Sequence, residues 1–137
     1  MNQCVFCQIV EGRSPVSIIM ETGNTLAFLD LTQLNPGHVL VIPKQHYVDI
    51  YNIPELILQE VICTVKKTST LLRENLKVYD LSIWQSTGKL AGQEIMHFHF
   101  HLLPRNNSSE VKSLYYKKPF YPSRYNLDQL ASKIRGE

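Results

Sequence analysis

The most regular pattern of apolar and polar positions lies between residues 95 and 104. Its polar positions are three histidines and its apolar positions are large, so that His97, His99 and His101 alternate with Phe98, Phe100 and Leu102. Strict alternation over this length predicts a β-strand with one buried face. Because strand side chains point to opposite faces with a period of two, the three imidazoles should share one face. A rigid strand would then carry three groups that can titrate near neutral pH.

The remaining hydrophobic pattern predicts further strands and one long helix. Apolar residues at three- and four-residue spacing favour an amphipathic helix over 55–75. Shorter apolar runs bounded by Gly, Pro and Asn predict strands. We expect these strands over 16–20, 25–30, 39–43 and 78–84, and a short terminal helix over 127–134. The first two strands would form a hairpin around residues 21–24, where Gly23 and Asn24 tolerate a positive φ.

These elements predict an α+β fold. About five mostly antiparallel strands would carry one long helix and one or two short helices. The 137 residues are enough for a compact core, and 44% apolar with 19% charged residues is ordinary for a soluble globular protein. The chain shows no internal repeat and no linker-like stretch, so we expect a single domain over residues 1–137.

Charge and composition exclude several function classes. The net charge of +2 is too small to favour nucleic acid as a partner. Residues 105–137 carry seven Lys and Arg against three acidic residues, whereas residues 1–104 carry seven against nine; we expect the basic tail to be a solvated surface. No apolar run is long enough to span a membrane, and the first residues do not resemble a secretory signal. We therefore expect a cytoplasmic protein with reduced cysteines.

Three interpretations of the histidine row compete. The imidazoles could be structural, although three of the chain's five histidines share this one strand face. They could bind a metal, but same-face neighbours on a strand are about 6.6 Å apart and the outer pair could hardly share one ion. They could carry phosphoryl or nucleotidyl transfer, with one imidazole as nucleophile and another binding phosphate. We favour the third interpretation, with a metal at one end of the row.

Cys4 and Cys7 form a C-x-x-C pair near the N-terminus. Two cysteines alone are a weak zinc signal, because a tetrahedral site needs four ligands. A thioredoxin-like redox pair fits poorly, because no strand precedes the motif. The sequence pattern leaves two unliganded thiols as the remaining alternative.

The stretch His97-Phe-His-Phe-His-Leu-Leu103 closely resembles the His-x-His-x-His-x-x signature, with x apolar, of the histidine triad superfamily of nucleotide hydrolases and transferases. The resemblance continues through Ala91–Gln93 and Pro104-Arg105. It also includes Pro36–Lys44, which is similar to the Pro-Gly-His-x-Leu-Val-Ile-Pro-Lys segment of that family. It extends from Cys4 to about Arg105 and fades over residues 106–137, to which we assign no function.

The resemblance implies a set of site residues. Zinc would be held as a closed structural ion by Cys4, Cys7, His46 and His97. The catalytic group would comprise His99 as nucleophile, His101 and Gln93 on phosphate, and His97 as the support of the row. The nucleotide would contact Phe6, Ile9, Phe28, Asp30, Leu31, His38, Ser86, Gln93, His99 and His101. In this set Phe28 packs on the base and Asp30 accepts hydrogen bonds from the ribose, although Phe28 could equally be a core residue.

The resemblance also implies a reaction. A purine nucleoside 5′-phosphate derivative, either a phosphoramidate or a dinucleoside polyphosphate, would be hydrolysed through a covalent nucleotidyl-histidine, with no organic cofactor. A nucleotidyl transferase or phosphorylase, and a nucleotide-binding module with weak catalysis, are the alternatives. Glu94 stands where some branches of the family carry Ser or Thr, which leaves the preferred leaving group open, and Ser86 falls near a position that is usually Asn or Gln. By the same resemblance we expect a homodimer.

Overall fold

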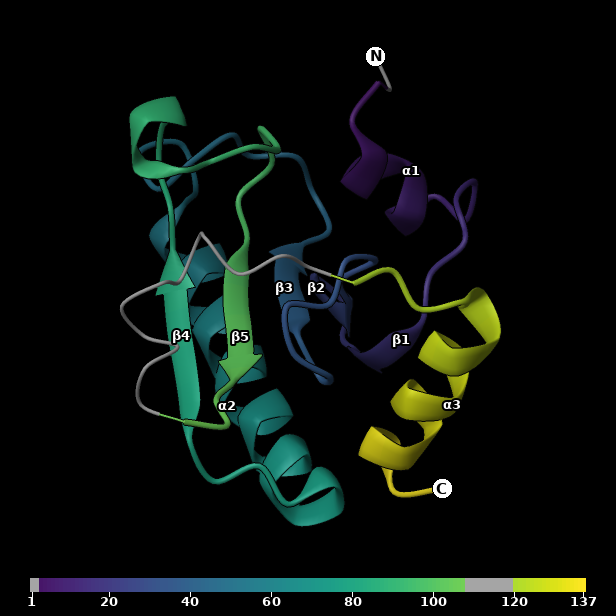
Figure 1. Cartoon of the computed structure of the whole chain (residues 1–137). Coiled ribbons are helices and arrows are strands. Elements are labelled where there is room, and N and C mark those ends of the chain that lie inside the picture. The colour runs from purple at the N-terminus through teal and green to yellow at the C-terminus, as the bar shows by residue number, and fades with distance from the viewer. Residues whose placement is uncertain (1–2, 108–119) are drawn as a thin grey trace.

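The computed structural model describes residues 3–107 and 120–137. Along the chain the elements are α1 (Val5–Val10), β1 (Ile18–Glu21), β2 (Thr25–Leu29), β3 (Val39–Pro43), α2 (Glu55–Leu76), β4 (Leu81–Gln85), the 3₁₀ turn η1 (Lys89–Ala91), β5 (Phe100–Pro104) and α3 (Arg124–Arg135). The strands form one antiparallel sheet in the order β1-β2-β3-β5-β4 (Figure 1). The predicted α+β architecture, with one long and two short helices, is confirmed.

The helices α2 and α3 cover one face of the sheet, and the short helix α1 lies on the other face. The helix α2 packs on β1, β2, β3 and β5, and α3 packs on α2, β1 and β2 (Figure 1). Alternate residues of β2 and β3 therefore enter two separate apolar clusters. The helix-side core contains Ala27, Leu29, Val39 and Val41, whereas the α1-side cluster contains Phe6, Leu26, Phe28, Leu40 and Ile42. Burial on both faces explains why β3 is apolar throughout.

The histidine segment enters this sheet only at its end. The strand β5 begins at Phe100, not at residue 95 as predicted. Before that point the backbone N–H of Phe98 donates to Tyr47 O at 2.7 Å instead of joining the ladder. The alternation nevertheless persists, because Phe98, Phe100 and Leu102 still pack in or against the helix-side core.

Several other boundaries differ from prediction. The strand over 78–84 is shorter at its start, because Lys77 ends α2 in the left-handed conformation and pairing with β5 begins at Leu81. The helix α3 begins earlier than residue 127, since the Ser123 hydroxyl caps it by accepting from Asn126 N. In the β1–β2 turn neither Gly23 nor Asn24 has a positive φ. The helix α1 was not foreseen, and Cys4 is its N-cap.

The C-terminal segment is described only from Phe120 onward. The aromatic stretch 115–122, which we predicted to be extended, lies mostly outside the described residues. Its end pairs with the loop between β2 and β3, where Phe120 and Gln33 exchange backbone hydrogen bonds of 3.0 and 3.3 Å in an isolated bridge. None of the helices in residues 3–107 and 120–137 has the length and apolar character needed to cross a membrane.

Gly37 precedes His38 and β3 in a buried turn with φ of +95°. A β-carbon there would stand 2.9 Å from Leu76 Cδ2 and 3.1 Å from Pro104 Cγ. We predict that Gly37→Ala lowers the free energy of unfolding by about 1–3 kcal/mol, because it adds both backbone strain and a clash.

Urea unfolding measures this effect, and Gly23→Ala is the matched control. Gly23 has no positive φ and nothing within 4 Å of its added carbon, so its substitution should change stability little. Equal stability of the two variants would show that the Gly37 turn is not constrained in this way.

Candidate functional site

The three histidines of the row face two neighbouring places. His97 points to a cluster beside α1, while His99 and His101 face a cavity between α1 and the sheet. The ring of Phe6 separates the two places, with centroid distances of 5.6 Å to His97 and 5.3 Å to His99. The His99 and His101 rings are 4.9 Å apart. One short segment thus contributes to both a candidate metal centre and a candidate active site.

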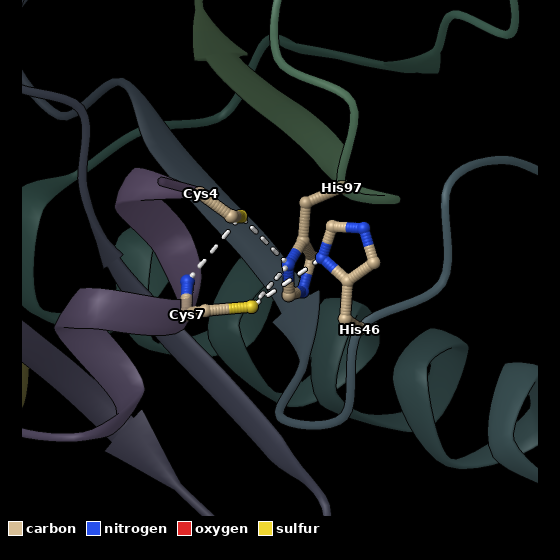
Figure 2. A group of neighbouring side chains, drawn as sticks. All are labelled: Cys4, Cys7, His46 and His97. Carbon is tan, nitrogen blue, oxygen red and sulfur yellow. Dashed lines mark hydrogen bonds between the residues drawn. The ribbon is translucent and has the colours of Figure 1, made fainter. Parts of the chain in front are cut away.

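Four side chains from distant parts of the chain converge at the metal centre. Cys4 and Cys7 come from α1, His46 from the segment after β3, and His97 from the row (Figure 2). The distances are 3.4 Å from Cys4 Sγ to His97 Nδ1 and 3.3 Å from Cys7 Sγ to His46 Nδ1. All four ligand atoms lie within 4.8 Å of one another. The predicted ligand set is therefore assembled in space.

The ring of His97 is oriented for metal binding by its second nitrogen. Nε2 donates to the carbonyl oxygen of Pro43 at 2.9 Å, so Nδ1 carries the lone pair that faces the two sulfur atoms. Burial lowers the pKa of this fully buried ring to about 4 and keeps it neutral. Two cysteine sulfurs and two imidazoles, one of them fixed by a backbone carbonyl, are a donor set suited to tetrahedral Zn²⁺.

His99 has the protonation state that a nitrogen nucleophile requires. Its Nδ1 donates to the carbonyl oxygen of His97 at 2.7 Å, which leaves a lone pair on Nε2. Burial lowers the pKa of the ring below its usual 6.5, against the opposing field of Asp30 and Glu94. The ring is therefore neutral at physiological pH, and it lines the cavity.

His101 is held between two partners. Its ring stacks on Trp84 at a centroid distance of 4.5 Å with an interplanar angle of 8°. Its Nδ1 is 3.0 Å from Nε2 of His38, whose own Nδ1 lies 3.7 Å from the Asp30 carboxylate. Burial lowers the pKa of His101 to about 3 and that of His38 to about 4, while it raises the pKa of Asp30. His38 therefore lies between His101 and Asp30 on the cavity wall and is hydrogen-bonded to His101.

The cavity has a volume of about 680 Å³. Eight of the ten predicted nucleotide contacts line it, and these are Phe6, Ile9, Phe28, Asp30, Leu31, His38, His99 and His101. Phe6 and Phe28 meet edge to face at 5.5 Å and form an apolar end. The imidazoles occupy the polar end. An apolar planar group and an anionic group could therefore bind at opposite ends of one cavity.

Gln93 and Ser86, the other two predicted contacts, do not line this cavity. The Gln93 side chain is buried and donates to Val48 O at 2.7 Å and Ile95 O at 3.1 Å, while its oxygen accepts from Gly88 N at 2.8 Å. Both of its N–H donors are thus committed to backbone carbonyls. The Gln93 side chain therefore holds the loop before the histidine row in place. The Ser86 side chain is also buried.

Three residues of the site have no counterpart in the sequence-based prediction. Trp84 reaches His101 because β4 and β5 pair in that register. Gln33 donates to the backbone oxygens of Asp30 and His38 at 2.7 and 2.9 Å, and so fixes the loop that carries both. Arg124 reaches the cavity from α3. Of these three, only Trp84 could have been suspected from the sequence, because it is an aromatic residue at the end of the strand predicted over 78–84.

Comparison with known proteins agrees with this geometry. The model of the HIT domain family matches residues 11–108. An uncharacterized HIT-like protein of Methanocaldococcus jannaschii is 37% identical over 97% of this chain and 99% of its own length. An adenosine 5′-monophosphoramidase of Schizosaccharomyces pombe is 37% identical over 87% of this chain and 85% of its own. A crystal structure of a Zn-bound histidine triad family protein from Mycobacterium smegmatis has a TM-score of 0.83 and 32% identity, covering 98% of this chain and 91% of that one.

Proposed function

The chain belongs to the HIT domain family, and we propose that it hydrolyses nucleoside 5′-phosphate derivatives at the α-phosphorus through His99. The observation that carries this proposal is the state of His99, a neutral ring whose Nε2 lone pair is left available by the hydrogen bond of Nδ1 to His97 O. The phosphoramidase activity named for the Schizosaccharomyces pombe relative supports the same chemistry.

The proposed nucleotide lies along the cavity. The base, a purine as in adenosine 5′-monophosphate, packs against the apolar wall that Phe6 and Phe28 form, near Ile9 and Leu31. The ribose hydroxyls donate to Asp30. This carboxylate already accepts two hydrogen bonds from Thr32 through Oδ1, so its Oδ2 is the oxygen left for the sugar. The phosphate then falls at the imidazole end of the cavity, beside His99 and His101.

We propose two steps of transfer. First, the His99 Nε2 lone pair forms a bond to phosphorus while the bond from phosphorus to the leaving nitrogen breaks. The electron pair of that bond stays on the leaving amine, which takes a proton from solvent. The positive charge that develops on the His99 ring is stabilised by the His97 carbonyl at Nδ1. Second, a water oxygen bonds to phosphorus, the P–Nε2 bond breaks, and the water releases a proton. The products are a nucleoside monophosphate and a protonated amine.

His101 acts on the phosphate oxygens in this scheme. We assign the hydrogen between the two rings to His38 Nε2, so that Nε2 of His101 keeps its own hydrogen and donates it to phosphate. Stacking on Trp84 keeps that ring in one orientation. Gln93 contributes by holding the loop of Gly88–Ile95, because its donors are already used by the backbone.

The same intermediate would serve a nucleotidyl transferase or phosphorylase if an acceptor other than water attacked it. A nucleotide-binding module is the remaining alternative. The orientation of His99 favours catalysis over binding alone, because a module would need no fixed nucleophile.

For the metal centre we propose one structural Zn²⁺ held by Cys4, Cys7, His46 and His97. The donor set and the Zn-bound Mycobacterium smegmatis relative support this assignment. With all four ligands supplied by protein, the ion would be closed to substrate. It would stabilise the fold and anchor α1 to the histidine row.

We also propose that the protein forms a homodimer through the β4 edge of the sheet. Within the described residues this strand pairs only with β5, and exposed apolar side chains lie on or near it, including Tyr79 and Ile83. A monomeric molar mass by light scattering would contradict the proposal.

For zinc, we predict about one ion per purified chain, in protein never exposed to chelator. Cys4→Ser and His46→Ala should each lose the ion and lower the melting temperature by several degrees, because metal binding contributes to folding free energy. Metal analysis and calorimetry measure both quantities. The control is Cys63→Ser, an exposed thiol in α2 away from the cluster, which should keep both values. An unmodified protein without zinc would refute the site.

For the nucleophile, we predict that His99→Ala lowers turnover of adenosine 5′-phosphoramidate by about a thousandfold or more. Nucleotide binding should persist, because base and ribose contacts remain, and imidazole added to His99→Gly should restore part of the activity. Rapid quench with labelled substrate, followed by mass spectrometry, should find the nucleotide attached to His99. Substantial turnover by His99→Ala would contradict the mechanism.

A further inference from the structure

A second cavity, of about 410 Å³, adjoins the nucleotide cavity. The two share part of their walls, and the shared residues are Val5, Glu94 and Ile95. The second cavity is otherwise lined by Gln3, Cys4, His46, Val48 and Met96. It therefore adjoins the nucleotide cavity on the side of the candidate metal centre. Glu94, whose charge acts on the His99 ring, lines both cavities, so a ligand bound beside His99 can extend past Glu94 into the second cavity.

Glu94 is the charged residue at this boundary. Among the described residues that line the second cavity it is the sole acidic side chain, and no Lys or Arg lines that cavity. Its backbone position is fixed, because the preceding Gln93 side chain bonds both to Gly88 N and to Ile95 O, on either side of Glu94. The Glu94 side chain is exposed, so its carboxylate can meet a ligand without a large desolvation cost.

We propose that the second cavity is the leaving-group site and that Glu94 selects substrates whose leaving amine carries a positive charge. The inference rests on the proposed hydrolase function and adds the chemical class of the leaving group. An alkyl amine with a terminal ammonium fits both features of the site, with its carbon chain along Val48 and Met96 and its charge near Glu94. A polyphosphate leaving group would bring its negative charge close to the negative Glu94 carboxylate, and the repulsion would disfavour it.

The expected size of this selection is moderate. Opposite charges several ångströms apart near a protein surface interact by about 1 kcal/mol at an effective dielectric between those of protein and water, and like charges repel by a similar amount. A free-energy difference of this size corresponds to a change of roughly fivefold in kcat/KM for each unit of charge changed on the leaving group. Salt should reduce the selection, because Glu94 is exposed.

The test is a series of adenosine 5′-phosphoramidates whose amine chain has one fixed length and ends in an ammonium, a methyl or a carboxylate group. For the unmodified protein, kcat/KM should fall in that order by roughly fivefold at each step. Glu94→Gln should bring the three substrates to within about twofold of one another, and Glu94→Lys should reverse their order. Glu74→Gln, an exposed acidic residue on α2, is the control that should leave the order unchanged.

Each outcome bears on the inference. Equal kcat/KM for the three substrates with unmodified protein, or a spread that persists in Glu94→Gln, would overturn it while leaving the hydrolase function intact. Failure of all three substrates to turn over would instead overturn the proposed function, and this inference with it. Melting temperatures of the Glu94 variants within a few degrees of the unmodified protein show that the comparison is made between folded enzymes.

Discussion

The site depends on one hydrogen bond within a five-residue stretch, from Nδ1 of His99 to the carbonyl oxygen of His97. It determines which nitrogen of His99 faces the cavity with a lone pair. The carbonyl is in turn held by its own side chain, because the His97 ring bonds to Pro43 O and faces Cys4 and Cys7. His97 therefore links the candidate metal centre to His99, because its side chain belongs to the cluster and its carbonyl oxygen accepts the hydrogen bond from His99 Nδ1.

Burial is the second physical requirement. His38, His97, His99 and His101 all lie in surroundings that favour the neutral ring. Neutrality suits a nucleophile and a metal ligand, but it removes positive charge from the phosphate end of the cavity. In the proposed mechanism, hydrogen-bond donation by His101, and not a positive charge on the imidazoles, therefore stabilises the phosphate. The negative charge of Glu94 near this end is consistent with a site that favours cationic over anionic leaving groups.

Local patterns were sufficient to predict much of this arrangement. The strict alternation of histidines with Phe98, Phe100 and Leu102 correctly placed the imidazoles opposite the core, and the apolar run of β3 was found with its correct bounds. The assembly of Cys4, Cys7, His46 and His97 could be proposed only through the family resemblance. The start of β5 could not be predicted, because it depends on the bond between Phe98 and Tyr47, which are far apart in sequence. The commitment of Gln93 to Val48 and the approach of Trp84 to His101 are equally non-local.

The most direct test of the account is ¹⁵N NMR of the histidine rings as a function of pH. We predict that His99 at pH 7 is a neutral imidazole with its proton on Nδ1, and that it becomes charged only below its usual pKa of 6.5, because burial lowers its pKa. An Nε2-protonated ring, or a ring charged at neutral pH, would contradict the assignment of His99 as the nucleophile.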